Sequence, residues 1–350
     1  MSVRAIMLPN WIGDAVLAAP AVRLLTRADG GARAVLVAHP RVAPLYGRWP
    51  CLSLLVSGRG IGGMARVARR LRRGGVEEAI LLSPSMRSAL VPYVAGIRAR
   101  VGYASDGRGV LLTRALPVSP REVHLAKQYL ALAAGLAGSS DHSRGRARAI
   151  DSDEDLDPAL PIGDDEIDEA ARRLSALGFE GNRTIALCPG ATYGETKRWP
   201  LKHWVRLGKI LQAGGRQIVI VGGGDESRAG QTLALEIGRE TRSLAGEMSL
   251  RQSLALLRLV AGAVSNDSGA MHLATAAGCP VVGLFGSTNP EWTGPLGRRS
   301  AALSLGLPCS PCYGRKCPTE IECLRDLQPE MVARRLALHL ASPAAEGGRS

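Results

Sequence analysis

A chain of 350 residues is longer than one typical domain and predicts two domains of about 100–200 residues each. Apolar residues make up 46% of the sequence and charged residues 21%, which excludes a disordered protein. Aromatic residues make up only 4%, which argues against a base-stacking surface.

The net charge of +13 is concentrated in the first half of the chain. Residues 1–150 contain 22 basic and 7 acidic side chains, whereas residues 151–350 contain 22 basic and 24 acidic ones. A basic half suits an anionic partner such as a phospholipid surface, a phosphorylated glycolipid or a nucleic acid. A genome rich in Arg codons is the alternative, because Arg outnumbers Lys 39 to 5, but it does not explain the asymmetry.

No stretch of 18 apolar residues occurs, so no membrane-spanning helix is expected. Asn10 and Asp14 interrupt the apolar segment near the N-terminus, which therefore does not fit a signal peptide. We expect a cytoplasmic protein whose seven cysteines are reduced.

The first half alternates apolar runs with helical patterns. The runs predict strands over residues 3–8, 34–38 and 79–82, and the periodicity predicts helices over 15–26 and 64–73. Such alternation is typical of βαβ units and predicts an α/β fold with a parallel sheet.

The loop after the first strand contains Asn10, Trp11, Gly13 and Asp14. Gly13 allows a tight turn, and Asp14 stands where a helix begins. Asp14 is then either a helix N-cap or a general base, and the spacing alone does not separate these two roles.

The second half repeats the pattern after a polar stretch. It predicts strands over residues 184–188, 217–221, 263–265 and 281–285, and helices over 164–177, 201–212 and 329–340. We expect an N-terminal domain over residues 1–150, a linker over 151–166, a C-terminal domain over 167–328, and a helix over 329–343 that packs back toward the N-terminal domain. Two such domains create a cleft, which is a usual place for ligands.

Three loops of the second half can bind anions or nucleotides. In residues 189–200, small residues, hydroxyls and the cations Lys197 and Arg198 suit a phosphate, and a solvated basic loop is the alternative. After the glycines 222–224, Asp225 could accept hydrogen bonds from a ribose or cap a helix. Around Ser268 and Gly269, a helix N-terminus could bind a diphosphate. His272 in that helix fits a core position better than a catalytic one.

Four cysteines, Cys309, Cys312, Cys317 and Cys323, lie within 15 residues. Their spacing is compatible with a zinc site, and also with a compact structural loop or a redox pair.

Taken together, these loops resemble the bacterial heptosyltransferases of lipopolysaccharide core assembly, glycosyltransferase family nine. The resemblance rests on residues 8–15 (LPNWIGDA), 189–191 (PGA) with 197–200 (KRWP), 266–269 (NDSG) with His272, and 284–288 (LFGST), and extends to about residue 335. It implies the GT-B fold, in which two Rossmann-like domains face each other across a cleft. The N-terminal domain would receive the acceptor and the C-terminal domain would bind ADP-heptose.

The resemblance also implies a role for each matching residue. Asp14 would be the general base, and Lys197 would stabilise the leaving diphosphate. The remaining implied site residues are Thr192, Tyr193, Asp225, Asp267, Ser268 and Gly269 for the donor, and Asn10, Trp11 and Gly13 for the acceptor.

The implied reaction is the inverting transfer of L-glycero-D-manno-heptose from ADP-heptose to the first heptose of the Kdo–lipid A core. Heptosyltransferase I or III, or a GT-B enzyme with another donor, is the alternative. No cofactor is expected and metal dependence stays open; the cysteines are interpreted as a structural loop rather than a metal site. We expect a monomer that is peripheral to the inner membrane and has no nucleic-acid partner. Arg66, Arg69, Arg70, Arg72 and Arg73 would either contact anionic headgroups or form a solvated face.

Overall fold

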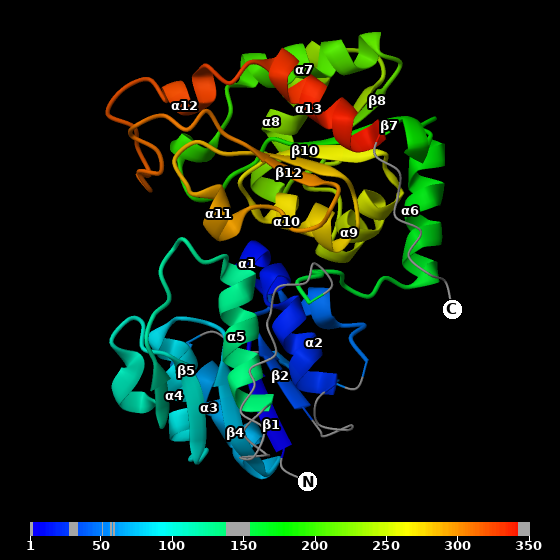
Figure 1. Ribbon diagram of the computed structural model, residues 1–350. Coiled ribbons are helices and arrows are strands. Elements are labelled where there is room, and N and C mark those ends of the chain that lie inside the picture. The colour runs from blue at the N-terminus through cyan, green and yellow to red at the C-terminus, as the bar shows by residue number, and fades with distance from the viewer. Residues whose placement is uncertain are drawn as a thin grey trace. The chain divides into compact units, whose positions relative to one another are not determined.

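The computed structural model describes residues 3–27, 34–50, 52–56, 58, 60–137 and 155–341. The chain divides into two compact units, Met1–Pro161 and Ile162–Ser350. Each unit contains one six-stranded sheet of parallel strands with helices packed on it (Figure 1). The α/β class with two Rossmann-like domains is therefore confirmed.

The N-terminal unit has the strand order β3-β2-β1-β4-β5-β6. Its strands are β1 (Val3–Met7), β2 (Ala34–Ala38), β3 (Leu52–Val56), β4 (Val76–Leu81), β5 (Ala99–Tyr103) and β6 (Arg114–Leu116). Its helices are α1 (Ile12–Leu17), α2 (Ala19–Arg27), η1 (Ala43–Tyr46), α3 (Gly60–Arg73), α4 (Met86–Val94), η2 (Arg108–Leu111) and α5 (Leu125–Ala137). The strand order reverses between β1 and β4, and ligands of such folds bind beyond the carboxyl ends of the strands at this point.

The helix expected over residues 15–26 is two helices in the structure. Helix α1 begins at Ile12 and ends at Leu17, and α2 begins at Ala19. Pro20 has no N–H group, so it cannot donate the hydrogen bond that would continue α1 into α2. The break leaves α1 as a short helix directly after the loop that contains Trp11 and Gly13.

The C-terminal unit has the order β12-β11-β10-β7-β8-β9, which is the same topology counted from its own first strand. Its strands are β7 (Thr184–Cys188), β8 (Gln217–Ile220), β9 (Thr241–Ser243), β10 (Gly262–Asn266), β11 (Val281–Leu284) and β12 (Ser300–Leu303). Its helices are α6 (Asp164–Ala176), η3 (Gly181–Arg183), η4 (Glu195–Lys197), α7 (Leu201–Ala213), η5 (Gly224–Glu226), α8 (Ser227–Ile237), α9 (Leu250–Leu259), α10 (Gly269–Ala276), α11 (Pro290–Thr293), α12 (Glu322–Arg325) and α13 (Pro329–Ala341). The switch point of this sheet lies between β7 and β10.

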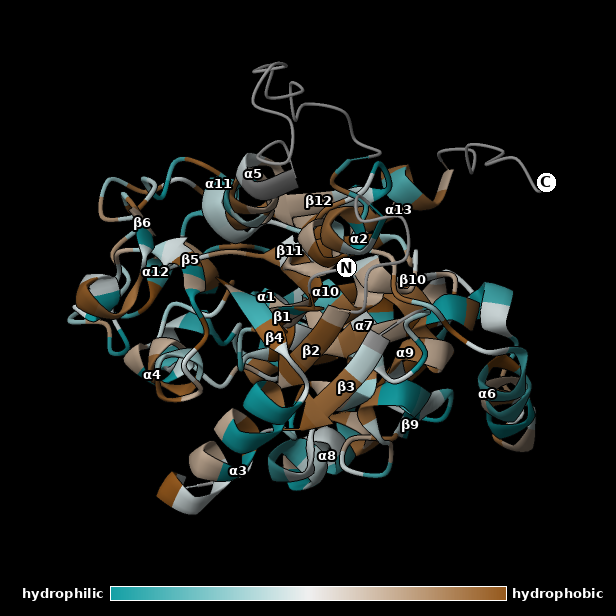
Figure 2. Ribbon diagram, turned by 90° about the horizontal axis from the view of Figure 1, so that it is seen from below, coloured by the Kyte–Doolittle hydropathy of each residue, from teal (hydrophilic) through white to brown (hydrophobic). Residues whose placement is uncertain are grey.

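Apolar strands form the interior of both units. Strands β7, β8, β10 and β11 are buried along their whole length, as parallel strands covered on both faces must be. In Figure 2 strand β2 is brown, whereas α3 and α6 carry hydrophilic teal stretches, as amphipathic surface helices do.

The apolar face of the last helix packs within the C-terminal unit. Helix α13 lies beside α7, and Val332 and Leu336 are fully buried in the core of the C-terminal unit (Figure 1). Gly262 allows this close packing, because a Cβ there would lie 2.9 Å from Leu340. Helix α13 also contacts β10, β11 and β12, so it covers part of one face of the C-terminal sheet.

The expected linker also differs in part from the structure. The boundary between the units falls inside residues 151–166, but α6 begins at Asp164, so residues 164–166 are helical. Glu166 accepts a hydrogen bond from the Gly163 N–H and from Arg251 Nε, which fixes the start of α6. Residues 151–154 of the expected linker and 342–343 of the expected last helix lie outside the described residues. Within the described part of the chain, no helix is long and apolar enough to cross a bilayer.

Candidate functional site

Asn266, at the end of β10, joins both ends of the loop that follows β7. Its Nδ2 donates to the Pro189 carbonyl at 2.6 Å, and its Oδ1 accepts from the Trp199 N–H at 3.2 Å. The side chain is fully buried. Residues 189–199, called the donor loop below, are therefore held against the switch point of the C-terminal sheet. This role of Asn266 was not predicted from the sequence, because it depends on contacts with residues 67 and 77 positions away.

Two predicted site residues, Lys197 and Asp267, meet at this switch point. Lys197 Nζ lies 2.6 Å from Asp267 Oδ2, and the same oxygen accepts from Thr288 Oγ1 at 2.5 Å. Asp267 is only 5% exposed, and Lys197 is 15% exposed. A buried carboxylate needs such donors, so the ion pair places the ammonium group at the carboxyl edge of the sheet.

The N-terminus of α10 adjoins Asp267. Ser268 is the N-cap residue, but its side chain makes no capping hydrogen bond; its Oγ lies 3.4 Å from Ser265 Oγ instead. Gly269 is the first residue of the helix. An N-terminus without a side-chain cap can bind an anion through its backbone N–H groups and the helix dipole. His272 is buried within the same helix.

Thr192 and Tyr193 lie on the outer part of the donor loop, and both are exposed. The Tyr193 hydroxyl donates to the Tyr313 carbonyl at 2.8 Å, and Lys197 Nζ lies 5.1 Å from the Tyr193 ring centroid. The structure thus brings Tyr193 and Lys197 together. Thr192 lies on the same loop, one residue before Tyr193.

Glu226, rather than Asp225, reaches toward the switch point. A Cβ on Gly190 would lie 1.6 Å from Glu226 Oε1, and one on Gly222 would lie 2.5 Å from Glu226 Oε2. The Glu226 carboxylate therefore occupies the space that glycine leaves open at the ends of β7 and β8. It accepts from the Gly223 N–H at 2.8 Å, whereas Asp225 is exposed. Sequence position alone does not show which of these two acids points toward the ends of β7 and β8.

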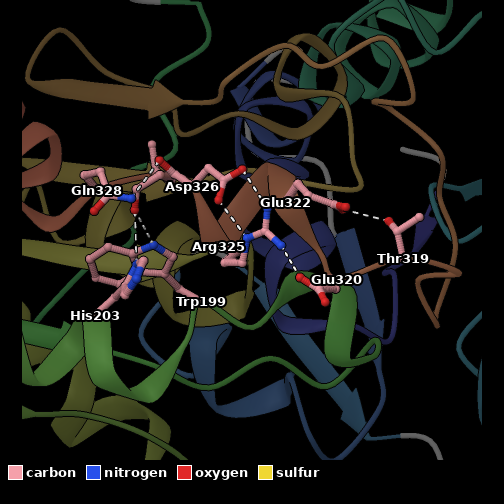
Figure 3. A network of polar contacts seen from close by, with 9 residues as sticks. Trp199, His203, Thr319, Glu320, Glu322, Arg325, Asp326 and Gln328 are labelled. Carbon is pink, nitrogen blue, oxygen red and sulfur yellow. Dashed lines mark hydrogen bonds and ion pairs between the residues drawn. The ribbon is translucent and has the colours of Figure 1, made fainter.

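A C-terminal segment supports the donor loop. Residues 309–328, called the strap below, contact it through Tyr193 and through Thr196 Oγ1, which donates to the Gly314 carbonyl at 2.5 Å. At the other end of the strap, Trp199 Nε1 donates to the Leu327 carbonyl at 2.9 Å (Figure 3). The strap is thus bound to the donor loop at both ends of the segment 193–199.

All four strap cysteines are free thiols. Cys309 and Cys312 are exposed, whereas Cys317 and Cys323 are partly buried. Burial raises the pKa of Cys323, and the nearby thiols add to this, while a hydrogen bond with the Thr319 hydroxyl lowers the pKa of Cys317. Among the described residues, no three His, Cys, Asp or Glu side chains are arranged around a common metal position.

In the N-terminal unit, Asp14 lies in the first turn of α1. The N-cap is Trp11, so the alternative in which Asp14 caps this helix is wrong. Asp14 is partly buried, and its charge adds to burial in raising the pKa of Tyr129 on α5. Gly13 precedes it within α1, and Asn10 is exposed.

Trp11 is 56% exposed, and the Arg41 guanidinium lies 5.3 Å from its ring centroid. An exposed indole with a cation on it can pack against the apolar face of a sugar. Trp11 therefore offers a contact surface immediately before the helix that holds Asp14.

A cavity of about 180 Å³ opens beyond the ends of β1, β2 and β4. Its floor is apolar, and none of its lining residues in the described part of the chain is Asp or Glu. Its polar lining residues are Asn10, His39, Ser83, Ser85, Arg87 and Ser88. Such a lining suits a neutral or anionic group such as a sugar rather than a cation.

Arg108 supports the wall of this cavity from inside. It is fully buried and donates to the Ser83 carbonyl, to Ser88 Oγ at 3.0 Å and to the Tyr103 carbonyl at 2.9 Å. Burial lowers the pKa of Arg108 to about 10, so the group stays protonated at neutral pH. Arg108 was not predicted as a functional residue, because the sequence does not distinguish a buried arginine from the many exposed arginines of the N-terminal half.

The comparisons with known proteins agree on one family. The family model described as "Glycosyltransferase family 9 (heptosyltransferase)" matches residues 64–321. The chain is 31% identical over 312 residues to lipopolysaccharide heptosyltransferase 2 of Escherichia coli, covering 85% of this chain and 86% of that protein. The chain belongs to glycosyltransferase family 9. It is therefore a glycosyltransferase.

Solved structures of family 9 enzymes have the same fold. The structure of E. coli ADP-heptose lipopolysaccharide heptosyltransferase II matches with a TM-score of 0.79 and 29% identity, over 97% of this chain and 98% of that one. The E. coli heptosyltransferase WaaC with ADP matches with a TM-score of 0.68 and 17% identity, over 96% and 99%. The second likeness concerns the fold alone. The GT-B architecture expected from the resemblance is confirmed.

Proposed function

We propose that this family 9 enzyme transfers L-glycero-D-manno-heptose from ADP-heptose to the first heptose of the Kdo–lipid A core, with inversion at the anomeric carbon. The observation that supports this most is the Lys197–Asp267 ion pair beside the N-terminus of α10. A cation and backbone dipoles at one point suit a diphosphate leaving group. Lipopolysaccharide heptosyltransferase 2 of E. coli matches 85% of the chain in sequence, and the E. coli heptosyltransferase II structure matches 97% of it.

The C-terminal unit is proposed to bind the donor. Lys197 would offset the negative charge that develops on the departing diphosphate, and Ser268 and Gly269 would present backbone N–H groups to it. Thr192 and Tyr193 would line the sugar–diphosphate pocket from the donor loop. These residues supply the required positive charge from the chain itself, so we propose that no cofactor is needed.

The N-terminal unit is proposed to receive the acceptor. Asp14 would take the proton from the acceptor hydroxyl as its oxygen attacks the anomeric carbon and ADP leaves. Asn10, Trp11 and Gly13 would contact the acceptor beside it. The cavity at the ends of β1, β2 and β4 would accommodate a further sugar of the acceptor.

Glu226 is proposed to hold the ribose of the donor in place of Asp225. We expect Glu226→Gln to weaken ADP binding by about tenfold, because a carboxylate accepts stronger hydrogen bonds from a diol than an amide does. Asp225→Asn is the matched control and should leave the affinity within about twofold. Calorimetry of both variants with ADP measures the difference, and the reverse order would return the role to Asp225.

Helix α3 is proposed to hold the enzyme at an anionic lipid surface, and so at the cytoplasmic face of the inner membrane. Arg66, Arg69, Arg70, Arg72 and Arg73 are all exposed, and within the described residues none of them has an ion-pair partner. Each arginine near an anionic bilayer contributes about 1 kcal/mol.

We expect binding to phosphatidylglycerol vesicles that weakens as salt is added, and little binding to phosphatidylcholine vesicles. Charge reversal of Arg69 and Arg70 to Glu should reduce sedimentation with the vesicles. Equally little sedimentation with both lipids would favour the interpretation of these arginines as a solvated face.

The donor assignment is tested by incubating the protein with a panel of sugar nucleotides and measuring release of the nucleoside diphosphate in the presence of core acceptor. ADP-heptose should be consumed and UDP- or GDP-sugars should not. Consumption of another sugar nucleotide in preference to ADP-heptose would identify a different GT-B transferase.

A further inference from the structure

The positive charge of Lys197 is largely offset before any donor binds. Its ammonium group lies 2.6 Å from the buried Asp267 carboxylate. Arg198, the next cation of the donor loop, turns back on the loop and donates to the Ala191 carbonyl at 3.1 and 3.2 Å. A donor diphosphate carries a charge of about −2. The Lys197–Asp267 pair is neutral and the helix N-terminus supplies only a partial positive charge, so a further cation would be needed to balance the diphosphate.

Arg315 of the strap lies beside the Tyr193 ring, as Lys197 does. Its guanidinium carbon is 5.2 Å from the centroid of the Tyr193 ring, and Lys197 Nζ is 5.1 Å from the same centroid. Two cations therefore share one aromatic side chain at the outer edge of the donor loop. In the described part of the chain, Arg315 has no carboxylate within ion-pair distance, and its side chain is exposed.

The backbone of Arg315 is fixed against the donor loop. A Cβ on Gly194 would lie 2.6 Å from the Arg315 carbonyl oxygen, so only glycine permits this approach. The residues before it are held by the Thr196–Gly314 and Tyr193–Tyr313 hydrogen bonds, and the Tyr313 N–H donates to the Ser287 carbonyl at 2.7 Å. These contacts fix the backbone from which the Arg315 side chain extends beside the donor loop.

The acids of the strap are engaged elsewhere, as Figure 3 shows. Arg325 donates to Asp326 at 2.7 Å and pairs with Glu320, and Thr319 donates to Glu322 at 2.7 Å. These contacts turn the strap carboxylates toward Arg325 and Thr319. None of these three strap carboxylates pairs with Arg315, so its charge is available to an anionic ligand.

We propose that Arg315 is a second cationic ligand of the donor diphosphate, positioned by the strap. The inference rests on the proposed function, because it assumes a nucleoside diphosphate donor in the C-terminal unit. Arg315 would contact the phosphate oxygens through its N–H groups, while Lys197 meets them from the side of Asp267. The strap, which the sequence interpretation treated as a structural loop, then contributes a binding residue.

Calorimetric titration with ADP and with adenosine tests this on the full-length protein. Arg315→Ala should weaken ADP binding by about tenfold or more and leave adenosine binding unchanged, since only ADP carries the diphosphate. Arg315→Lys, which keeps the charge, should recover part of the loss. Lys316→Ala is the matched control, as it removes a neighbouring exposed cation of the strap, and should change ADP binding by less than about twofold.

Unchanged ADP affinity of Arg315→Ala, while the wild type binds ADP, would overturn the inference and leave the proposed function intact. Equal weakening of ADP and adenosine would also overturn it, because it would show a distorted loop rather than a lost phosphate contact. Failure of the wild type to bind ADP at all would instead overturn the donor assignment on which the inference rests.

Discussion

Replacing Asp14 with Asn should lower kcat by at least about 10²-fold and leave the affinity for ADP-heptose unchanged. Asn has nearly the shape of Asp but cannot accept the proton of the attacking hydroxyl. Asp14 is not the N-cap of α1, so the fold does not need its carboxylate for that purpose. Single-turnover and steady-state kinetics with a core acceptor measure kcat, and calorimetry measures donor binding.

Glu122→Gln is the matched control for Asp14, because it neutralises an exposed acid of the same unit. Its kcat should stay within about twofold of the wild type. If Asp14→Asn turned over nearly as fast as the wild type, Asp14 would not be the base, and the acceptor hydroxyl would have to lose its proton to another group.

Replacing Lys197 with Ala is expected to have the second large effect. It removes the cation beside the leaving diphosphate, and kcat/KM for ADP-heptose should fall by about 10²-fold or more. It also leaves the buried Asp267 carboxylate with Thr288 as its remaining donor, so the free energy of unfolding should fall as well. Kinetics and urea unfolding of the same preparation measure both effects.

The double variant Lys197→Ala with Asp267→Asn separates the two effects. Removing the unpaired charge should recover most of the stability but none of the activity. Lys202→Ala, on the exposed start of α7, is the control for loss of a lysine and should change neither. Normal kcat/KM in Lys197→Ala would mean that the donor loop is only a solvated basic loop.

The sequence predicted well those elements whose pattern is local. The strands over residues 34–38 and 184–188 match β2 and β7 at both ends, because short apolar runs flanked by breaks define buried parallel strands. The motif around Asp267 was placed at a helix start, as α10 shows. The loop residues alone make Asp14 and Lys197 candidates, and the family resemblance supplies the specific role of each.

Elements and side-chain roles that depend on contacts between distant residues could not be predicted from the sequence. Strands β3, β5 and β6 of the N-terminal unit are defined by pairing with neighbouring strands, which the sequence alone does not show. Helices α4 and α5 are likewise absent from the sequence prediction. The direction of the Glu226 carboxylate could not be predicted either, because it is seen only from its contacts with Gly190 and Gly222, which are far apart in the chain. The role of the strap likewise depends on its hydrogen bonds to the donor loop.

The most direct test of the central claim is transfer by the purified protein from ADP-heptose to Kdo₂–lipid A acceptors that carry no heptose, one heptose or two. Mass spectrometry should show the gain of one heptose on the acceptor that already has one, and little change on the other two. Transfer to the acceptor with none, or only to the one with two, would instead identify an enzyme that adds the first or third heptose. No gain on any of the three would contradict the assignment to lipopolysaccharide core assembly.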